Sequence, residues 1–262
     1  MGRLLLHQHT YIQKLIQSPR MSQANPIDTP MEAKLNIQST TSGSENTLFH
    51  QLIGSLLFIA RISRPDISYP VNYLSRFHGK VTPEILGYAR RIIQYLNSSK
   101  DVSLVYASSS EECIAHVDAS FAPDLGNPKS VTGYLIYHFG NLISWGTKRQ
   151  TLVTVSSTAA EYIAISDIVP ELMLIKYLNQ EVFAIHHPIK VMEDNISTYQ
   201  IAESGERRRL RHTIIKQHAV LEAVEDHEIK IEHIEGKRQP ADGMTKQLDS
   251  IKYKEFCKFI FS

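Results

Sequence analysis

The chain has few cysteines and almost no net charge. Its 262 residues include only two cysteines, Cys113 and Cys257, too few for the disulfide framework of a small secreted domain or for a zinc site built on cysteine pairs. Twenty-eight Lys and Arg residues are balanced by 27 Asp and Glu residues, which leaves a formal charge of +1. No overall field therefore attracts nucleic acid or membranes, and a polyanionic partner must be held by local basic patches.

Long hydrophobic runs are also missing. The longest, LIGSLLFIA at residues 52–60, is about half of the roughly 20 residues that a membrane-spanning helix needs. The N-terminus lacks the layout of a secretory signal. We therefore expect an intracellular protein that makes no membrane contact. The hydrophobic content of 42% is enough for real cores, and the length favours two domains.

Residues 1–100 predict a mostly helical region. A short strand and a helix lead into residues 18–46, which are rich in Ser, Thr, Pro, Asn and Gln and are expected to be a linker. Apolar residues with helical spacing then predict three helices, at residues 45–62, 64–78 and 82–99.

Residues 101–262 change to a pattern of strands and helices. The expected order is β-β-β-α-β-α-α-β-α. The five strands of this order are predicted at residues 113–122, 131–140, 141–150, 189–194 and 229–235. This order predicts an α/β domain of the mixed α+β kind.

Four carboxylates occupy characteristic places in this order. Asp118 lies within an apolar strand, where a lone carboxylate is costly. Glu161 falls in the first turn of a long helix at 158–182, Asp194 ends the fourth strand, and Asp242 begins a late helix. If the first and fourth strands are neighbours, these side chains converge at one edge of the sheet.

Such a cluster favours metal chemistry. Clustered carboxylates stay ionised only beside cations, and ligands that are all oxygen favour Mg²⁺ or Mn²⁺. Two such ions about 4 Å apart can activate a water and stabilise the leaving oxygen of a phosphodiester.

Several blocks of sequence resemble a known family. HVDASFA, SSTAAEYIAIS, EDNISTYQIA and QPADGMTK are similar, in order, to four blocks of the ribonuclease H domain of Ty1/copia-type retrotransposon Pol polyproteins. LIGSLLFIARISRPDISYPVNYLSRF and ARRIIQYL resemble the region between polymerase palm and nuclease. The resemblance implies a ribonuclease H-like fold at 101–262, with a mixed five-stranded sheet and flanking helices. It also implies the palm end and helical thumb/connection region of a reverse transcriptase at 1–100.

The resemblance further implies an enzyme. Asp118, Glu161, Asp194 and Asp242 would hold two Mg²⁺ (or Mn²⁺) ions and hydrolyse the RNA strand of RNA–DNA hybrids. The implied partners are the hybrid and the polymerase part of a reverse transcriptase, in the cytoplasm (within a virus-like particle) or in the nucleus. The sequence gives no indication of oligomeric state.

Two further points limit this interpretation. Integrases of the same fold place a Glu last, so the order Asp, Glu, Asp, Asp disfavours a strand transferase. The sequence contains no Asp-Asp pair, so the chain is expected to lack a polymerase active site and to be the C-terminal part of a longer polyprotein.

Basic residues near these blocks are candidates for phosphate contacts. A hybrid is recognised mainly by its shape, its phosphates and its 2′-hydroxyls, so base-specific residues are not expected. The simpler alternative for the run RRRLR at 207–211 is a solvated helix face. The candidates are Lys148, Arg149, Arg207, Arg208, Arg211, His212, Lys237 and Arg238.

Each acid also has a simpler structural interpretation. Glu161 could complete a capping box with Thr158. The pair Asp194-Asn195 could simply cap the helix that follows the strand, and Asp242 could cap or charge a helix start. Asp118 could be a buried, paired aspartate. His116 shares the strand face of Asp118, and packing is favoured there over contact with substrate.

A second hypothesis for the whole chain is an inactive remnant. Pro170 lies inside the long helix and Gly243 follows the last acid, and both residues weaken a helix. A chain of this kind would keep the fold and bind nucleic acid or a polymerase partner without cleavage.

Overall fold

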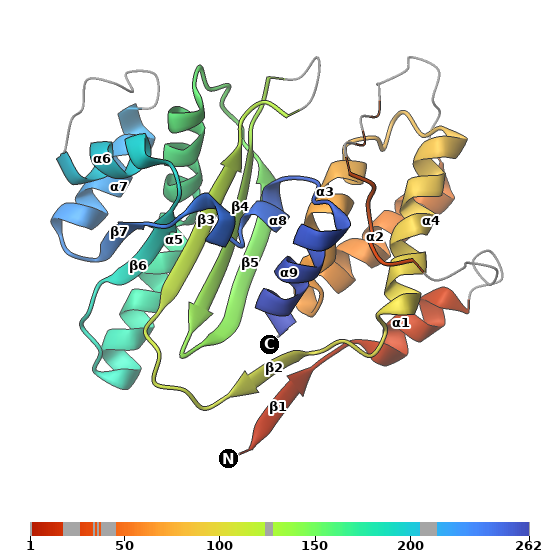
Figure 1. Cartoon of the computed structure of the whole chain (residues 1–262), viewed down its shortest axis with the longest axis horizontal. Helices are drawn as coiled ribbons and strands as arrows, with labels where there is room; N and C mark the ends of the chain where they lie inside the picture. The colour runs from red at the N-terminus through yellow and green to blue at the C-terminus, as the bar shows by residue number, and fades with distance from the viewer. Residues whose placement is uncertain are drawn as a thin grey trace. The chain divides into compact units, whose positions relative to one another are not determined.

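The computed structural model describes residues 2–17, 27–33, 35, 37, 46–123, 128–204 and 214–261. The chain forms two compact units, coloured along the chain in Figure 1. The first, here called the helical unit, takes residues 1–108 and 246–262, and the second, the sheet unit, takes residues 109–245.

The helical unit contains the three predicted helices. Within the described residues they are α2 (Thr47–Ile62), a 3₁₀ turn continued by α3 (Ser68–Ser75), and α4 (Pro83–Ser98). The start of α4 is set by Thr82, whose hydroxyl accepts a hydrogen bond from the Ile85 N–H at 3.3 Å. Four further elements belong to this unit: β1 (Arg3–Leu6), α1 (His9–Ile16), β2 (Leu104–Ala107) and α9 (Ser250–Phe261).

A buried polar network joins α9 to the rest of the helical unit. Arg64 and Asp66 form an ion pair of 2.6 Å whose side chains are fully buried. The Tyr95 hydroxyl donates to Asp66 Oδ2 at 2.6 Å, and the Tyr253 hydroxyl of α9 donates to the Asp66 carbonyl at 3.2 Å. Because Arg64 and Asp66 neutralise each other, the network stabilises the position of α9 without an unpaired charge in the apolar core.

The sheet unit contains the predicted mixed sheet, with strand order β5-β4-β3-β6-β7. The pairs β3–β4 and β4–β5 are antiparallel, whereas β3–β6 and β6–β7 are parallel. The expected neighbourhood of the first and fourth strands is thus confirmed, and so is the ribonuclease H-like fold. The strands are β3 (Ile114–Ser120), β4 (Val131–His138), β5 (Asn141–Arg149), β6 (Ile189–Glu193) and β7 (Ile229–His233).

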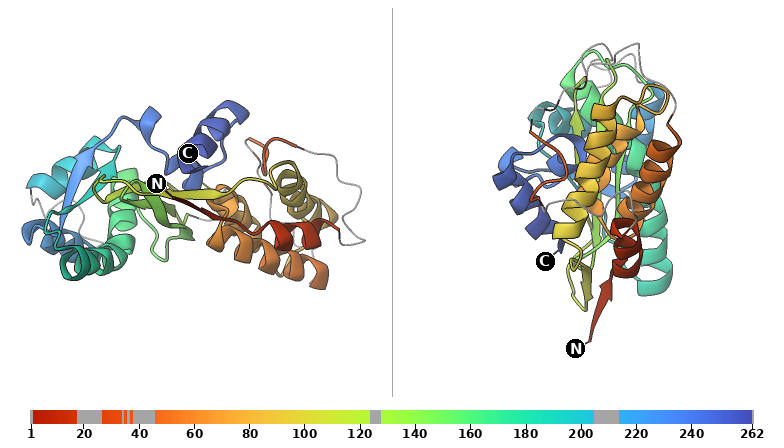
Figure 2. Two further views of the ribbon diagram at one scale, coloured as in Figure 1. Left: turned by 90° about the horizontal axis from the view of Figure 1, so that it is seen from below. Right: turned by 90° about the vertical axis from the view of Figure 1, so that its right-hand side faces the viewer.

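Helices cover both faces of this sheet. The long α5 (Ser157–Phe183) packs on β3 and β4, as Figure 2 shows in green to teal. Small side chains such as Ala115 of β3 and Ala160 of α5 are completely buried in this contact, which lets the helix approach closely. On the opposite face lies the short α8 (Asp242–Thr245), against β3, β4 and β5.

Two further helices, α6 (Ile196–Ser204) and α7 (Ile214–Glu225), pack beside α5 and β7. Pro170 is exposed within α5, which continues through it without a break. In the described part of the chain, no helix combines the length and the hydropathy that crossing a membrane requires.

The predicted domain limits, 1–100 and 101–262, stay a prediction. The compact units differ from them because β2 pairs with β1 and because α9 belongs to the helical unit. Most of the predicted linker at 18–46 lies outside the described residues, and its described positions contain neither helix nor strand.

Candidate metal centre

The candidate site lies where two parallel strands diverge. Pairing between β3 and β6 ends at His116 and Met192, which leaves the following carbonyls without a strand partner. Gln239 replaces that partner, because its Nε2 donates to the Val117 carbonyl at 2.8 Å and to the Met192 carbonyl at 3.0 Å. The strands therefore separate without leaving buried carbonyls unsatisfied, and acidic residues follow on both.

The predicted carboxylates meet at this point. Asp118, Asp194 and Asp242 each offer an oxygen within 4.8 Å of the others. A second set within the same limit contains Glu161, Glu193 and Asp194. All four predicted acids thus belong to one cluster, joined through Asp194, and their role as ligands stays a prediction. Glu193 is a fifth member that the sequence interpretation missed.

Asp118 and Asp242 are placed by close packing of α8 on the sheet. Asp118 is 3% exposed, and its Oδ2 accepts a hydrogen bond from the hydroxyl of Thr245, which is fully buried. Opposite Asp118 in the ladder is Gly133, where an added Cβ would lie 2.6 Å from the Met244 Cβ. Only a residue without a side chain therefore admits α8, and with it Asp242, at this distance from the strand.

The capping-box interpretation of Glu161 is wrong. Helix α5 is capped by Ser156, whose hydroxyl accepts from the Ala159 N–H at 3.1 Å. The helix thus starts earlier than predicted, and Glu161 lies beyond the capping position. Its side chain is 6% exposed and accepts a hydrogen bond from the Ala119 N–H, while Glu161 Oε2 has no hydrogen-bond partner among the described residues.

Glu193 lies on the buried face of β6. It has no exposed surface and follows Ile189 and Val191 on the side of the strand that packs in the core. Its Oε1 accepts from the Asn195 N–H at 2.9 Å, whereas Oε2 has no hydrogen-bond partner in the described structure. The alternation of side chains along the strand could have identified Glu193, because it puts this acid on the apolar face.

The helix cap that the sequence allows at Asp194-Asn195 is formed by Asn195, whose Oδ1 accepts from the Ser197 and Thr198 N–H groups of α6 at 3.0 and 3.2 Å. The carboxylate of Asp194 belongs instead to both sets of clustered acids.

The cluster is electrostatically unfavourable without a cation. Burial raises the pKa of Glu161 well above its usual value, and the charges of Glu193, Asp118 and Asp194 raise it further. Burial also raises the pKa of Glu193, with Asp194 and Asp118 adding to the effect and the Asn195 N–H opposing it. An all-oxygen donor set with two buried oxygens that lack a hydrogen bond fits Mg²⁺ or Mn²⁺.

His116 occupies a packing position near the site. Its ring meets that of Tyr137 edge to face, with centroids 6.1 Å apart, and the residue is 8% exposed. Burial lowers the pKa of His116 to about 4, partly opposed by a hydrogen bond with Gln239. The ring is therefore neutral near pH 7, in agreement with the packing interpretation.

The predicted basic residues divide into three groups. Lys237 and Arg238 are exposed on a 3₁₀ turn whose Gly236 approaches the site, since a Cβ there would lie 3.0 Å from Asp194 Oδ2. Lys148 is exposed and Arg149 half-buried on the edge strand β5. The remaining four lie outside the described residues: Arg207, Arg208, Arg211 and His212.

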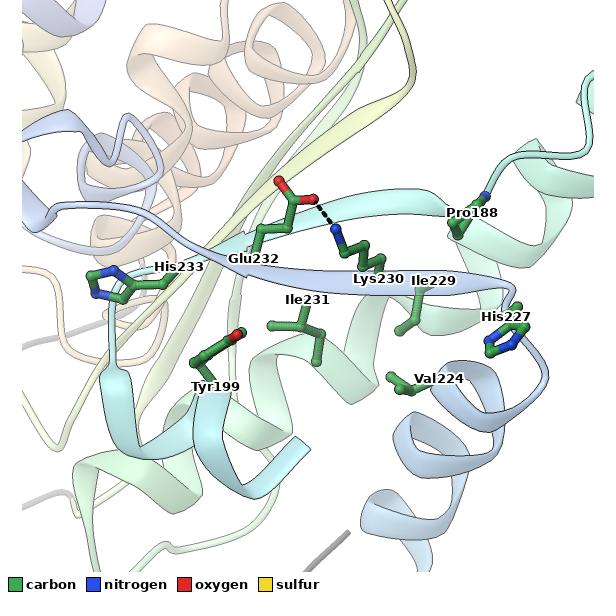
Figure 3. Close-up of a pocket in the computed structure, with 9 residues that line it drawn as sticks. All are labelled: Pro188, Tyr199, Val224, His227, Ile229, Lys230, Ile231, Glu232 and His233. Carbon is green, nitrogen blue, oxygen red and sulfur yellow. Dashed lines mark hydrogen bonds and ion pairs between the residues drawn. The ribbon is translucent and has the colours of Figure 1, made fainter. Parts of the chain in front are cut away.

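A pocket of about 630 Å³ lies apart from the predicted site residues, over the edge strand β7 (Figure 3). Ile231 points into it beside Tyr199 of α6, and Ile229 points toward Val224 of α7. Lys230 and Glu232 stand on the other face of the strand and form an ion pair of 2.8 Å. The pocket is mainly apolar and contains none of the predicted acids.

The chain is similar over nearly its whole length to transposon polyproteins. It is 30% identical over 265 residues to the retrovirus-related Pol polyprotein from transposon TNT 1-94 of Nicotiana tabacum, covering 98% of this chain and 20% of that protein. For the polyprotein from transposon RE1 of Arabidopsis thaliana, identity is 32% over 262 residues, 98% of this chain and 18% of that protein. The chain therefore spans about one fifth of these relatives.

A shorter relative is covered more fully. An uncharacterised mitochondrial protein of Arabidopsis thaliana is 30% identical over 165 residues, which are 62% of this chain and 68% of that protein. No protein-family model matches the chain.

Among solved structures, LC11-RNase H1 isolated from compost matches 51% of this chain and 92% of its own, with 15% identity and a TM-score of 0.39. The same enzyme in complex with an RNA/DNA hybrid matches 51% and 94%, with 14% identity and a TM-score of 0.40.

Proposed function

Because this chain is similar over 98% of its length to retrotransposon Pol polyproteins of the Ty1/copia type, we propose that its sheet unit is a metal-dependent ribonuclease H that hydrolyses the RNA strand of RNA–DNA hybrids. The observation that carries this proposal is the convergence of the acids. Asp118, Glu161, Asp194 and Asp242 come from four separate segments, yet they form one cluster.

In this proposal the four acids hold two divalent ions. Such ions supply a water nucleophile at neutral pH and stabilise the leaving oxygen of the phosphodiester. Thr245 donates to Asp118 and fixes the direction of its carboxylate, and Gln239 holds the two strand ends apart. The protein thereby offers acidic oxygens that are oriented before the ions and the substrate arrive.

The substrate would be held mainly through its backbone. Lys237 and Arg238 are exposed on the turn that approaches Asp194, at a place where they can contact phosphates beside the scissile bond. Contacts of this kind position a duplex without reading its bases, so cleavage should depend on salt more than on sequence.

The test is cleavage of a hybrid by the full chain, with the RNA strand and the DNA strand labelled separately. We expect cutting of RNA alone, dependent on Mg²⁺ or Mn²⁺. Asp194→Asn should reduce the rate by at least about a hundredfold, more than the loss of an outer-shell group usually costs. Asp226→Asn removes the same charge at an exposed position at the end of α7 and should leave the rate unchanged.

Full activity of Asp194→Asn would exclude the assigned metal site. A folded wild-type protein that binds hybrid but cuts neither strand would instead support the inactive remnant.

A further inference from the structure

We propose that Glu193 is a fifth carboxylate ligand of the metal centre, bound to the same divalent cation as Glu161 and Asp194. The inference rests on the metal site of the proposed function, but it does not require that the site cleaves RNA. It adds a ligand that the four-acid assignment leaves out.

The first observation is the position of the Glu193 carboxylate. Glu193, Glu161 and Asp194 each offer an oxygen within 4.8 Å of the other two. Glu193 is completely buried on the core face of β6, the face on which α5 and Glu161 lie. A glutamate at a strand position between core residues carries a large desolvation cost unless a partner compensates it.

The second observation is an oxygen with no partner. The Asn195 N–H binds Glu193 Oε1 at 2.9 Å and so fixes the orientation of the carboxylate. Neither Glu193 Oε2 nor Glu161 Oε2 has a hydrogen-bond partner among the described residues, and both are buried. These two buried oxygens can only accept hydrogen bonds or bind a cation, and they belong to one cluster of acids. Such a group of oxygens favours binding of a cation.

This ligand changes what the free protein can do. With Glu193 the set contains three carboxylates instead of two, and cation affinity rises with the charge of the ligand set. We therefore expect the protein to bind one Mn²⁺ ion before any nucleic acid is present, with an affinity that depends on Glu193.

Binding of Mn²⁺ to the full chain tests this directly, measured by the electron paramagnetic resonance signal of the free ion and without nucleic acid. Glu193→Gln keeps the size of the side chain and an acceptor for Asn195, but it removes the charge. We expect it to weaken Mn²⁺ binding by at least about tenfold, the least that even an outer-shell partner contributes. Glu222→Gln, at an exposed position of α7, is the matched control and should bind as the wild type does.

Thermal unfolding supplies a second readout that a purely structural role would not produce. In EDTA, Glu193→Gln should melt at the wild-type temperature or above it, because one buried like charge has gone. In Mn²⁺, the rise in melting temperature should be smaller for the variant than for the wild type. If the Gln variant does not fold, Glu193→Leu provides the same comparison with an apolar side chain of similar size.

The outcomes separate this inference from the proposed function. Equal Mn²⁺ affinity of Glu193→Gln and wild type would overturn the ligand role even if the wild type cleaves hybrid. A wild type that binds no Mn²⁺ would also overturn it, as expected if Glu161 and Glu193 only share a proton. Glu193-dependent binding in a protein that does not cleave would support the ligand and reject the nuclease.

Discussion

Thr245 determines how one carboxylate of the site is presented. It is fully buried, and its hydroxyl donates to Asp118 Oδ2. A hydroxyl that orients a ligand acts as an outer-shell group, whose loss typically costs about 10- to 100-fold in metal affinity or activity.

We predict that Thr245→Val lowers hybrid cleavage by about 10- to 100-fold. Valine keeps the shape but removes the donor, so the fold should survive. The measurement is the cleavage rate as a function of Mn²⁺ concentration. Thr245→Ser restores the hydroxyl and should recover most of the rate, whereas equal loss in Ser and Val would show that the methyl group and not the donor matters.

Both cysteines are predicted to be inert in the native protein. Burial raises the pKa of Cys113 to about 12. The pKa of Cys257 is also raised to about 12, and burial is the main cause. At pH 8 both stay protonated, and the thiolate is the reactive form. We expect no rapid reaction with Ellman's reagent in the folded protein and two equivalents in guanidinium; a fast native equivalent would contradict the burial of one thiol.

The residues of the site differ in how far they could be predicted. Asp118, Glu161, Asp194 and Asp242 could be predicted from their places in the order of strands and helices and from the blocks that resemble a family. Glu193 was readable from strand alternation alone, since it interrupts the buried face of β6. Thr245 gives no such signal, because its partner Asp118 is distant in the sequence and the hydrogen bond depends on the tertiary fold.

Among the elements, α8 has the strictest packing requirement. It approaches the sheet over Gly133, and it is also held by the Thr147 hydroxyl, which donates to the Met244 carbonyl at 2.7 Å. A side chain at Gly133 would meet the backbone and Cβ of α8 rather than a flexible end.

We predict that Gly133→Ala displaces α8 and with it Asp242. Overpacking of this kind typically lowers the free energy of unfolding by about 1 to 3 kcal/mol. The cleavage rate should fall even at temperatures where the variant remains folded, because Asp242 is displaced. Gly87→Ala is the control, because that glycine lies in α4 with nothing within 4 Å of an added Cβ. It should raise stability by about 0.5 to 1 kcal/mol. Melting temperature and cleavage rate check both variants, and unchanged cleavage by Gly133→Ala would show that α8 is not fixed by this contact.

Elements with regular periodicity were predicted well. The starts and ends of α2, α4 and β3 to β7 differ from prediction by a few residues at most, since alternation and capping are local. The start of α5 was placed at Thr158 because two capping residues lie close together, and Ser156 is the one whose hydroxyl reaches the free N–H.

In the whole molecule, the helical unit is built from two distant stretches of chain. Helix α9 contributes Tyr253, Phe256 and Ile260 to its core. The sequence could not reveal this, because an amphipathic pattern predicts that a helix packs on a core but does not identify which core.

We predict that Phe256→Ala destabilises the helical unit by about 3 to 5 kcal/mol, as expected for a buried Phe. Hydrogen exchange should increase in α2 to α4 while the central strands of the sheet unit stay protected. Phe259→Ala, on the same helix but 40% exposed, should have a much smaller effect. Loss of protection in β3 and β6 instead would contradict the division into these two units.

The same division determines the order in which the protein can fold as it is synthesised. The ribosome makes α2 to α4 first, then the whole sheet unit, and α9 only afterwards. Until Tyr253 and Phe256 emerge, the apolar surface that they cover has no partner from its own unit. During that interval the helices made earlier carry uncovered apolar surface, which favours aggregation and which chaperones can bind.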